Sequence, residues 1–370
     1  MRITRVTPHL LRVPLGGRSL PLAGHDPCVT RPEALAVLVV RAETDDGPTG
    51  LGFSYSAVGG RALLALAGDD IAPLLAGEDP LNHERIAAKV RHALREQAAG
   101  PLFAAAYAAV DLALWDLKGR AAGLPLWKLL GGAKPVAPAF LTDPLGPGGA
   151  AGQTVKLTQP ALKQGLLGVL LHLEGCPEHD AERVQQVREA LGEDVWLGVA
   201  AEGRYDRGTA LALGHLFENE IGADWFEQPL PDDDLDGLRR LAERLEIPLA
   251  LGTGCATLAQ VRRLLESGAV GVLRPDVVRL GGLTTWLKAA ALAEGFGVPV
   301  APLRLPEVGV HLACGLPGVQ TAEQAPWLAG LFTSSPTVGK GKLTPPAGPG
   351  LGLELATDAL AKWEVGKPPG

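Results

Sequence analysis

Val195-Trp-Leu-Gly-Val-Ala200 is a short apolar run that ends in a turn, and it belongs to a series. Similar runs recur at intervals of roughly 20–30 residues, with amphipathic helical segments between them. The series comprises residues 136–140, 168–173, 195–200, 223–227, 248–252, 271–274, 298–302 and 318–322. This alternation predicts an α/β fold, and eight such units favour a closed eight-stranded (β/α) barrel. A doubly wound sheet is the alternative, but no glycine-rich phosphate-binding fingerprint follows any of the runs.

The N-terminal part of the chain has a different rhythm. Residues 2–14 and 35–55 read as strands, and Asp45-Asp-Gly47 supplies a hairpin turn within the second stretch. Residues 61–76, 82–97 and about 102–122 have helical periodicity. We therefore expect a separate α+β domain that precedes the barrel.

Composition excludes several classes of function. The chain has 370 residues and a net charge of −7, and its basic residues form no run longer than Arg-Arg, so nucleic acid and acidic membranes are unlikely partners by charge alone. Its four cysteines show no CxxC spacing, which argues against a zinc ribbon and a disulfide framework. We find neither a signal-peptide pattern nor an apolar stretch of transmembrane length, and we expect a cytoplasmic protein.

Several longer motifs then occur in a specific order. They are Asp111-Leu-Ala-Leu-Trp-Asp-Leu-Lys-Gly119, Gly123-Leu-Pro-Leu-Trp-Lys-Leu-Leu-Gly-Gly132, Trp225-Phe-Glu-Gln-Pro-Leu230, Arg274-Pro-Asp276 with Gly281-Gly282, and Gly348-Pro-Gly-Leu-Gly352. In this order and at these separations, the chain resembles the mandelate racemase and muconate-lactonizing group of the enolase superfamily. The resemblance implies an N-terminal α+β capping domain (1–130), a modified eight-stranded barrel (131–330) and a C-terminal segment (331–370) that returns to the cap.

The resemblance also implies a chemistry. Members of this group are isomerases and lyases that bind small carboxylate substrates and form homo-oligomers. A magnesium ion held by three carboxylates binds the substrate carboxylate, and a base on the barrel removes the neighbouring α-proton. The enediolate that results is a dianion, which a hard divalent cation stabilises.

The metal positions of the family are mostly altered in this chain. The three ligand positions correspond to Ala200, Glu227 and Thr253, so that only Glu227 retains a carboxylate. Glu202, two residues beyond Ala200, is a candidate replacement. One carboxylate binds magnesium weakly, because affinity depends on ligand charge and magnesium gives up its water reluctantly. We therefore expect magnesium binding to be weak or absent.

The proton-transfer positions are altered as well. The two lysines of the second strand correspond to Leu170 and His172, and the histidine at the seventh strand corresponds to Leu303. Its aspartate partner is kept as Asp276, and the acidic residue near the eighth strand matches Glu323. His172 is either a structural residue, hydrogen-bonded to Glu227 or Asp276, or a general acid or base.

Two interpretations of function follow. In the first, the usual magnesium-dependent proton abstraction is lost, and the chain is a pseudoenzyme or a binding protein. In the alternative, it is an active isomerase or dehydratase on a hydroxy acid or sugar acid, with His172, Asp276 and Glu323 as the candidate catalytic residues.

Overall fold

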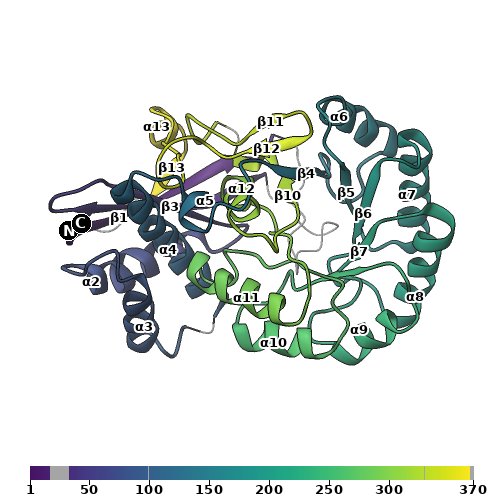
Figure 1. The fold of residues 1–370 in the computed structure, drawn as a ribbon, viewed down its shortest axis with the longest axis horizontal. Coiled ribbons are helices and arrows are strands. Elements are labelled where there is room, and N and C mark those ends of the chain that lie inside the picture. The colour runs from purple at the N-terminus through teal and green to yellow at the C-terminus, as the bar shows by residue number, and fades with distance from the viewer. Residues whose placement is uncertain (17–32, 99, 329, 367–370) are drawn as a thin grey trace.

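The structure is a computed structural model that describes residues 1–16, 33–98, 100–328 and 330–366. Figure 1 shows two parts side by side: a ring of helices around parallel strands, and a smaller sheet flanked by helices. Both the first strand and the last one belong to the smaller part. The α/β class with a capping domain and a barrel, as expected from the sequence, is confirmed by this architecture.

The capping domain contains a four-stranded antiparallel sheet in the order β13-β1-β2-β3. Its strands are β1 (Ile3–Pro14), β2 (Ala34–Thr44), β3 (Gly50–Ser56) and β13 (Glu364–Gly366). Its helices are α1 (Gly60–Ala65), the π-helix η1 (Leu66–Ile71), α2 (Ala72–Leu75), α3 (His83–Ala93), α4 (Pro101–Ala122) and the C-terminal α13 (Ala359–Trp363).

Helix α4 packs closely against β3 because glycines in the strand remove the side chains that would separate them. A Cβ atom on Gly52 would lie 1.9 Å from the carbonyl oxygen of Ala109. Pro101 stands in the first turn of α4, where its missing N–H is not needed, and Gly123 ends the helix with φ 64°. This contact fixes β3, and therefore Tyr55 near its end, relative to the rest of the cap.

The barrel follows the predicted alternation of strands and helices. Its strands are β4 (Ala137–Thr142), β5 (Gly168–His172), β6 (Trp196–Ala200), β7 (Trp225–Glu227), β8 (Leu249–Leu251), β9 (Val272–Leu273) and β10 (Ala322–Gln324). Its helices are α5 (Leu126–Leu129), α6 (Ala151–Lys163), α7 (Pro177–Leu191), α8 (Arg207–Leu216), η2 (Phe217–Ile221), α9 (Leu235–Ala242), α10 (Leu258–Glu266), α11 (Leu283–Gly295), α12 (Pro306–Gly315) and the short 3₁₀ helix η3 (Pro326–Leu328). Strands β4 to β9 pair in parallel, and β10 pairs with β4.

Three features of the barrel differ from the sequence prediction. Residues 298–302 form only isolated bridges, from Val300 to Leu273 and to Val319, because prolines at 299 and 302 remove backbone donors. The last strand, β10, begins later than the run at 318–322. Strands β11 (Thr337–Gly339) and β12 (Lys342–Thr344), which the sequence analysis did not predict, extend the sheet beyond β4.

The interior of the barrel contains a small apolar layer beneath the carboxyl ends of the strands. Its buried members are Phe140, Leu170, Ala200, Trp225, Ala250 and Ala301. Successive side chains of a strand point to opposite faces, so Leu170 lies in this layer while Val169 and Leu171 pack in the main core. Among the described residues, no helix combines the length and apolar character needed to cross a bilayer.

Candidate active site

The carboxyl ends of the barrel strands bring the family's site positions together at one mouth. His172 pairs with Ala200 in the ladder, and Ala200 pairs with Glu227, so these three residues stand at one level. A bridge joins Asp276 to Leu303 on the far side of the mouth. The strand ends of such barrels are where catalytic side chains gather.

Arg274 occupies the centre of this mouth and binds two carboxylates. Its Nε lies 2.8 Å from Oε2 of Glu227, and one of its terminal nitrogens lies 2.6 Å from Oε2 of Glu323. The other terminal nitrogen donates to the carbonyls of Ala301 and Pro302. The side chain is 0% exposed, so the ion triad is shielded from water.

A second buried arginine, Arg304, lies beside the first group. Its backbone N–H donates to Oε2 of Glu323 at 2.9 Å. Its guanidinium lies 3.4 Å from Oε1 of Glu202 and 3.5 Å from Oδ2 of Asp276. Glu323 therefore binds both arginines through one oxygen, and Asp276 and Glu202 flank the second arginine.

His172 contacts Glu202, whereas the structural one of the two alternatives left open by the sequence expected a hydrogen bond to Glu227 or Asp276. Its Nδ1 lies 3.4 Å from Oε1 of Glu202, and its Nε2 lies 3.2 Å from Oγ1 of Thr142. That expectation was wrong because Glu202 turns into the mouth with φ 54°, a conformation that the sequence pattern does not encode. Glu202 thus points into the mouth, as a replacement metal ligand would, but its neighbours there are His172 and Arg304.

The carboxylates of the mouth differ in the direction in which their surroundings shift their pKa. Burial alone would raise the pKa of Glu202, but the contact with His172 and the charge of Arg304 outweigh burial and lower it to about 2. Burial raises the pKa of Glu227 despite its bond to Arg274. Burial opposes ionisation of Glu323 too, yet Arg274 and the backbone N–H of Arg304 lower its pKa. The surroundings therefore favour the ionised form of Glu202 and Glu323, whereas burial opposes it for Glu227.

Tyr55 connects the cap to the mouth. Its hydroxyl donates a hydrogen bond of 2.7 Å to Oδ2 of Asp276, and burial together with the charge of Asp276 raises the pKa of the phenol far above its usual value. The phenol is thus a permanent donor. Tyr55, Arg274 and Arg304 were not among the site residues expected from the sequence. The sequence feature that could have identified them is a charged or phenolic side chain at the end of an apolar strand.

Backbone strain is concentrated at the same mouth. Five non-glycine residues of the described chain have positive φ, and four of them, Glu202, Gln228, Arg304 and Leu305, follow barrel strands here. Non-glycine residues adopt this conformation at a cost, and such residues cluster at functional sites. The left-handed backbone carries Glu202 and Arg304 into the mouth, and the surrounding contacts must offset its cost.

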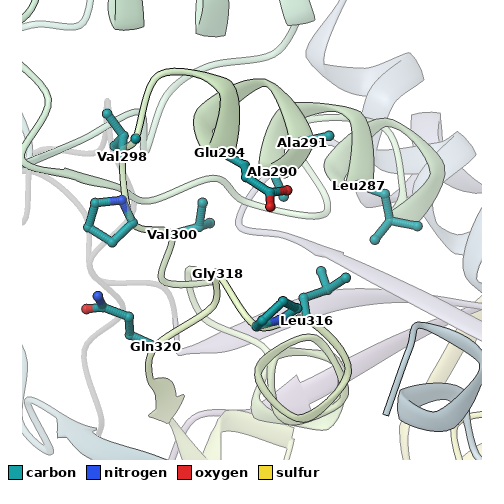
Figure 2. Close-up of a pocket in the computed structure, with 12 residues that line it drawn as sticks. Leu287, Ala290, Ala291, Glu294, Val298, Val300, Leu316, Gly318 and Gln320 are labelled. Atoms are coloured by element: carbon teal, nitrogen blue, oxygen red, sulfur yellow. The ribbon is translucent and has the colours of Figure 1, made fainter. Parts of the chain in front are cut away.

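A separate pocket of about 350 Å³ lies away from this mouth (Figure 2). Helix α11 forms one wall, and residues 298–300 and 316–320, which precede the strand ends, form the other. Its lining is mainly apolar, and none of the candidate catalytic residues reaches it. It therefore lies outside the candidate active site.

The comparisons with known proteins agree with this architecture. Residues 153–359 match the enolase C-terminal domain-like family, and residues 24–131 match the N-terminal domain of the mandelate racemase and muconate lactonizing enzymes. The chain belongs to the mandelate racemase/muconate-lactonizing group of the enolase superfamily. The family expected from the motifs is thereby confirmed.

Similar proteins within this family include a dehydratase and a cycloisomerase. L-talarate/galactarate dehydratase of Salmonella typhimurium is 33% identical over 90% of this chain and 85% of its own length. A 3,6-anhydro-alpha-L-galactonate cycloisomerase of Streptomyces coelicolor is 30% identical over 98% of this chain and 100% of its own. The crystal structure of the Salmonella dehydratase with Mg and L-lyxarohydroxamate has a TM-score of 0.91 at 31% identity and covers 100% of this chain and 95% of its own.

The donor set of this chain does not fit the magnesium ion that the family implies. Ala200 and Thr253 offer no carboxylate, and Oε2 of Glu227 is bonded to Arg274. No cluster of three or more His, Cys, Asp or Glu side chains suited to a metal exists within the part of the chain that the structure describes. Magnesium prefers several oxygen ligands in octahedral array, so these residues cannot supply the family site.

Proposed function

We propose that this protein is an isomerase or dehydratase of a hydroxy acid or sugar acid, in which the His172–Glu202 pair transfers the proton. The single observation that carries the proposal is the contact of 3.4 Å between His172 Nδ1 and the strained, ionised Glu202. A carboxylate that orients one ring nitrogen leaves the other to accept a proton, as in other histidine–carboxylate pairs. Relatives that act on galactarate and anhydrogalactonate support the substrate class.

The chemistry assigned to the site is proton transfer next to a carboxylate. Nδ1 of His172 lies 3.4 Å from Glu202 but makes no hydrogen bond in this structure, so the proposal requires a small rotation of the ring that directs Nδ1–H to Glu202. Nε2, which lies 3.2 Å from the hydroxyl of Thr142, then accepts the α-proton when substrate displaces that contact. The electron pair of the broken C–H bond passes into the carboxylate and forms an enediolate. In a dehydration, the protonated His172 then gives that proton to the β-hydroxyl, which leaves as water as the C–O bond breaks, and the enol product tautomerises to a keto acid.

The buried arginines and their partners have supporting roles in this proposal. Arg304 supplies positive charge beside the His172–Glu202 pair, where negative charge develops on the substrate. Asp276 and Glu323 act as positioning residues, because the first lies beside the guanidinium of Arg304 and the second accepts its backbone N–H.

A second candidate function is binding of a sugar acid without turnover. The observation that favours it is burial: His172, Arg274 and Arg304 are each at most 1% exposed, and all three are held by neighbouring polar groups. Catalysis requires the cap to admit substrate to these groups, whereas a binding protein requires no freely accessible base. Turnover therefore distinguishes the two candidates.

The test is exchange of the α-proton in heavy water across a panel of aldarates and aldonates, followed by proton NMR. Catalysis predicts exchange or keto-acid formation that falls at least about 100-fold in His172→Asn, because asparagine keeps hydrogen bonding but cannot accept the proton. His215→Asn on α8 is the matched control, since His215 is half exposed and remote from the mouth. Exchange that survives in His172→Asn refutes the assignment. Thermal stabilisation by an acid without any exchange supports the binding candidate.

A further inference from the structure

We infer that Arg274 is an internal cation that takes the place of the divalent metal and excludes it from the mouth of the barrel. This inference concerns which ions the mouth accepts, and it goes beyond the proposed reaction. It is independent of turnover, because metal binding is measured without substrate.

Arg274 holds the one metal-ligand carboxylate of the family that this chain retains, together with Glu323. Glu227 is the one metal-ligand position of the family that keeps a carboxylate in this chain, and it is bonded to Nε of Arg274 at 2.8 Å. The same guanidinium binds Glu323 at 2.6 Å. A metal ion that bound Oε2 of Glu227 would displace a guanidinium that is 0% exposed and leave it without its partner. A metal ion that bound Oε1, which has no hydrogen-bond partner, would lie beside the same positive charge and be repelled by it. A buried charge that loses its partner is strongly destabilising, so we expect metal affinity to fall by about 100-fold or more.

Several independent elements build the site of the Arg274 guanidinium. Arg274 lies over the rings of Phe140 and Trp225, at 5.4 and 5.2 Å from their centroids. It also donates to the carbonyls of Ala301 and Pro302. Cation–π contacts with two aromatic faces stabilise a guanidinium in a dry site and offer nothing to a hard cation that needs oxygen ligands.

Two arginines supply the positive charge of the mouth. Arg274 and Arg304 together place two positive charges among the carboxylates of the mouth, which equals the formal charge of one divalent ion. In contrast to a metal, these charges are covalently attached and cannot dissociate. The loss of carboxylates at Ala200 and Thr253 is consistent with this balance, because further anions would lack a counterion.

The experiment compares two restored variants. Ala200→Asp with Thr253→Glu restores both missing carboxylates and keeps Arg274, and a triple variant adds Arg274→Met. Titration of each with Mn²⁺, followed by calorimetry and electron paramagnetic resonance, measures binding directly. We expect no site in the wild type or the double variant, and one site in the triple variant, with a metal-dependent rise in Tm.

Controls separate charge from packing and from folding. Arg274→Lys in the double-variant background keeps the positive charge and should still exclude the metal. If the triple variant fails to fold without metal, refolding it with and without millimolar Mn²⁺ gives the same information, because recovery that depends on metal supports the inference. A 1:1 site in the double variant overturns it. So does a triple variant that binds no metal when folded, or that does not recover with metal.

Discussion

Replacement of Arg274 by methionine tests the central ion triad. Methionine retains much of the volume of the side chain but leaves the carboxylates of Glu227 and Glu323, each 1% exposed at the side chain, without their shared cation. Removal of one partner from a buried ion pair costs about 3–5 kcal/mol. For a two-state chain of this length, a loss of about 4 kcal/mol corresponds to a fall in Tm of about 5 °C.

The sign of the pH dependence strengthens this test. Burial already raises the pKa of Glu227. Without Arg274, both carboxyl groups titrate above their unfolded values, so the folded state holds protons that the unfolded state has released. The loss of unfolding free energy in Arg274→Met should therefore be largest near neutral pH. It should shrink as the pH falls towards the pKa of glutamate in the unfolded chain. Urea unfolding at several pH values measures it.

Two further variants control for this measurement. Arg262→Met breaks an ion pair with Glu266 whose side chains are 64% and 51% exposed, and it should cost less than about 1 kcal/mol. Arg274→Met combined with Glu227→Gln and Glu323→Gln removes all three charges and should recover much of the lost stability. A loss below about 1 kcal/mol in Arg274→Met, or a deficit that does not depend on pH, would refute this account of the mouth.

Three more predictions concern single side chains. Tyr55→Phe should cost about 1.5–3 kcal/mol in chemical unfolding, because Asp276 loses a charged hydrogen bond at the cap interface; an unchanged midpoint argues against that coupling. Burial raises the pKa of Glu307 to about 7 from 4.5, so stability should fall by up to about 3 kcal/mol as pH rises through that interval, and Glu307→Gln should abolish this slope. The pKa of Glu202 is lowered from 4.5 to about 2, so its contribution is present above 4.5 and should be lost as pH falls towards 2; Glu202→Gln should lack that acid-dependent loss when unfolding is followed by circular dichroism.

Much of the fold could be predicted from the sequence, because the apolar runs and their spacing are local patterns. The inward alternation of Leu170 and His172 and the register of Ala200 beside Glu227 follow from a period of two along parallel strands. The strands at 337–344 could not be predicted in the same way, since they are short, mostly exposed and defined by pairing with a distant strand.

Which side chains form the site was harder to predict than where in the barrel the site lies. The family motifs show that two carboxylates and a histidine are missing at Ala200, Thr253 and Leu303. They do not show which side chains supply charge to the mouth in their place. Arg274 lies 47 residues from Glu227 and 49 from Glu323, and the triad forms only when the barrel closes. Glu202 and Arg304 enter the mouth through left-handed backbone conformations, for which the sequence offers no glycine as a signal.

The most direct test of the central claim is α-proton exchange on sugar acids in heavy water, measured with a chelator and again with added Mg²⁺. The account predicts equal exchange under both conditions and its loss in His172→Asn, because the proton passes to His172 and the mouth carries its own cations. Exchange that requires Mg²⁺, or no exchange on any aldarate or aldonate, would contradict it.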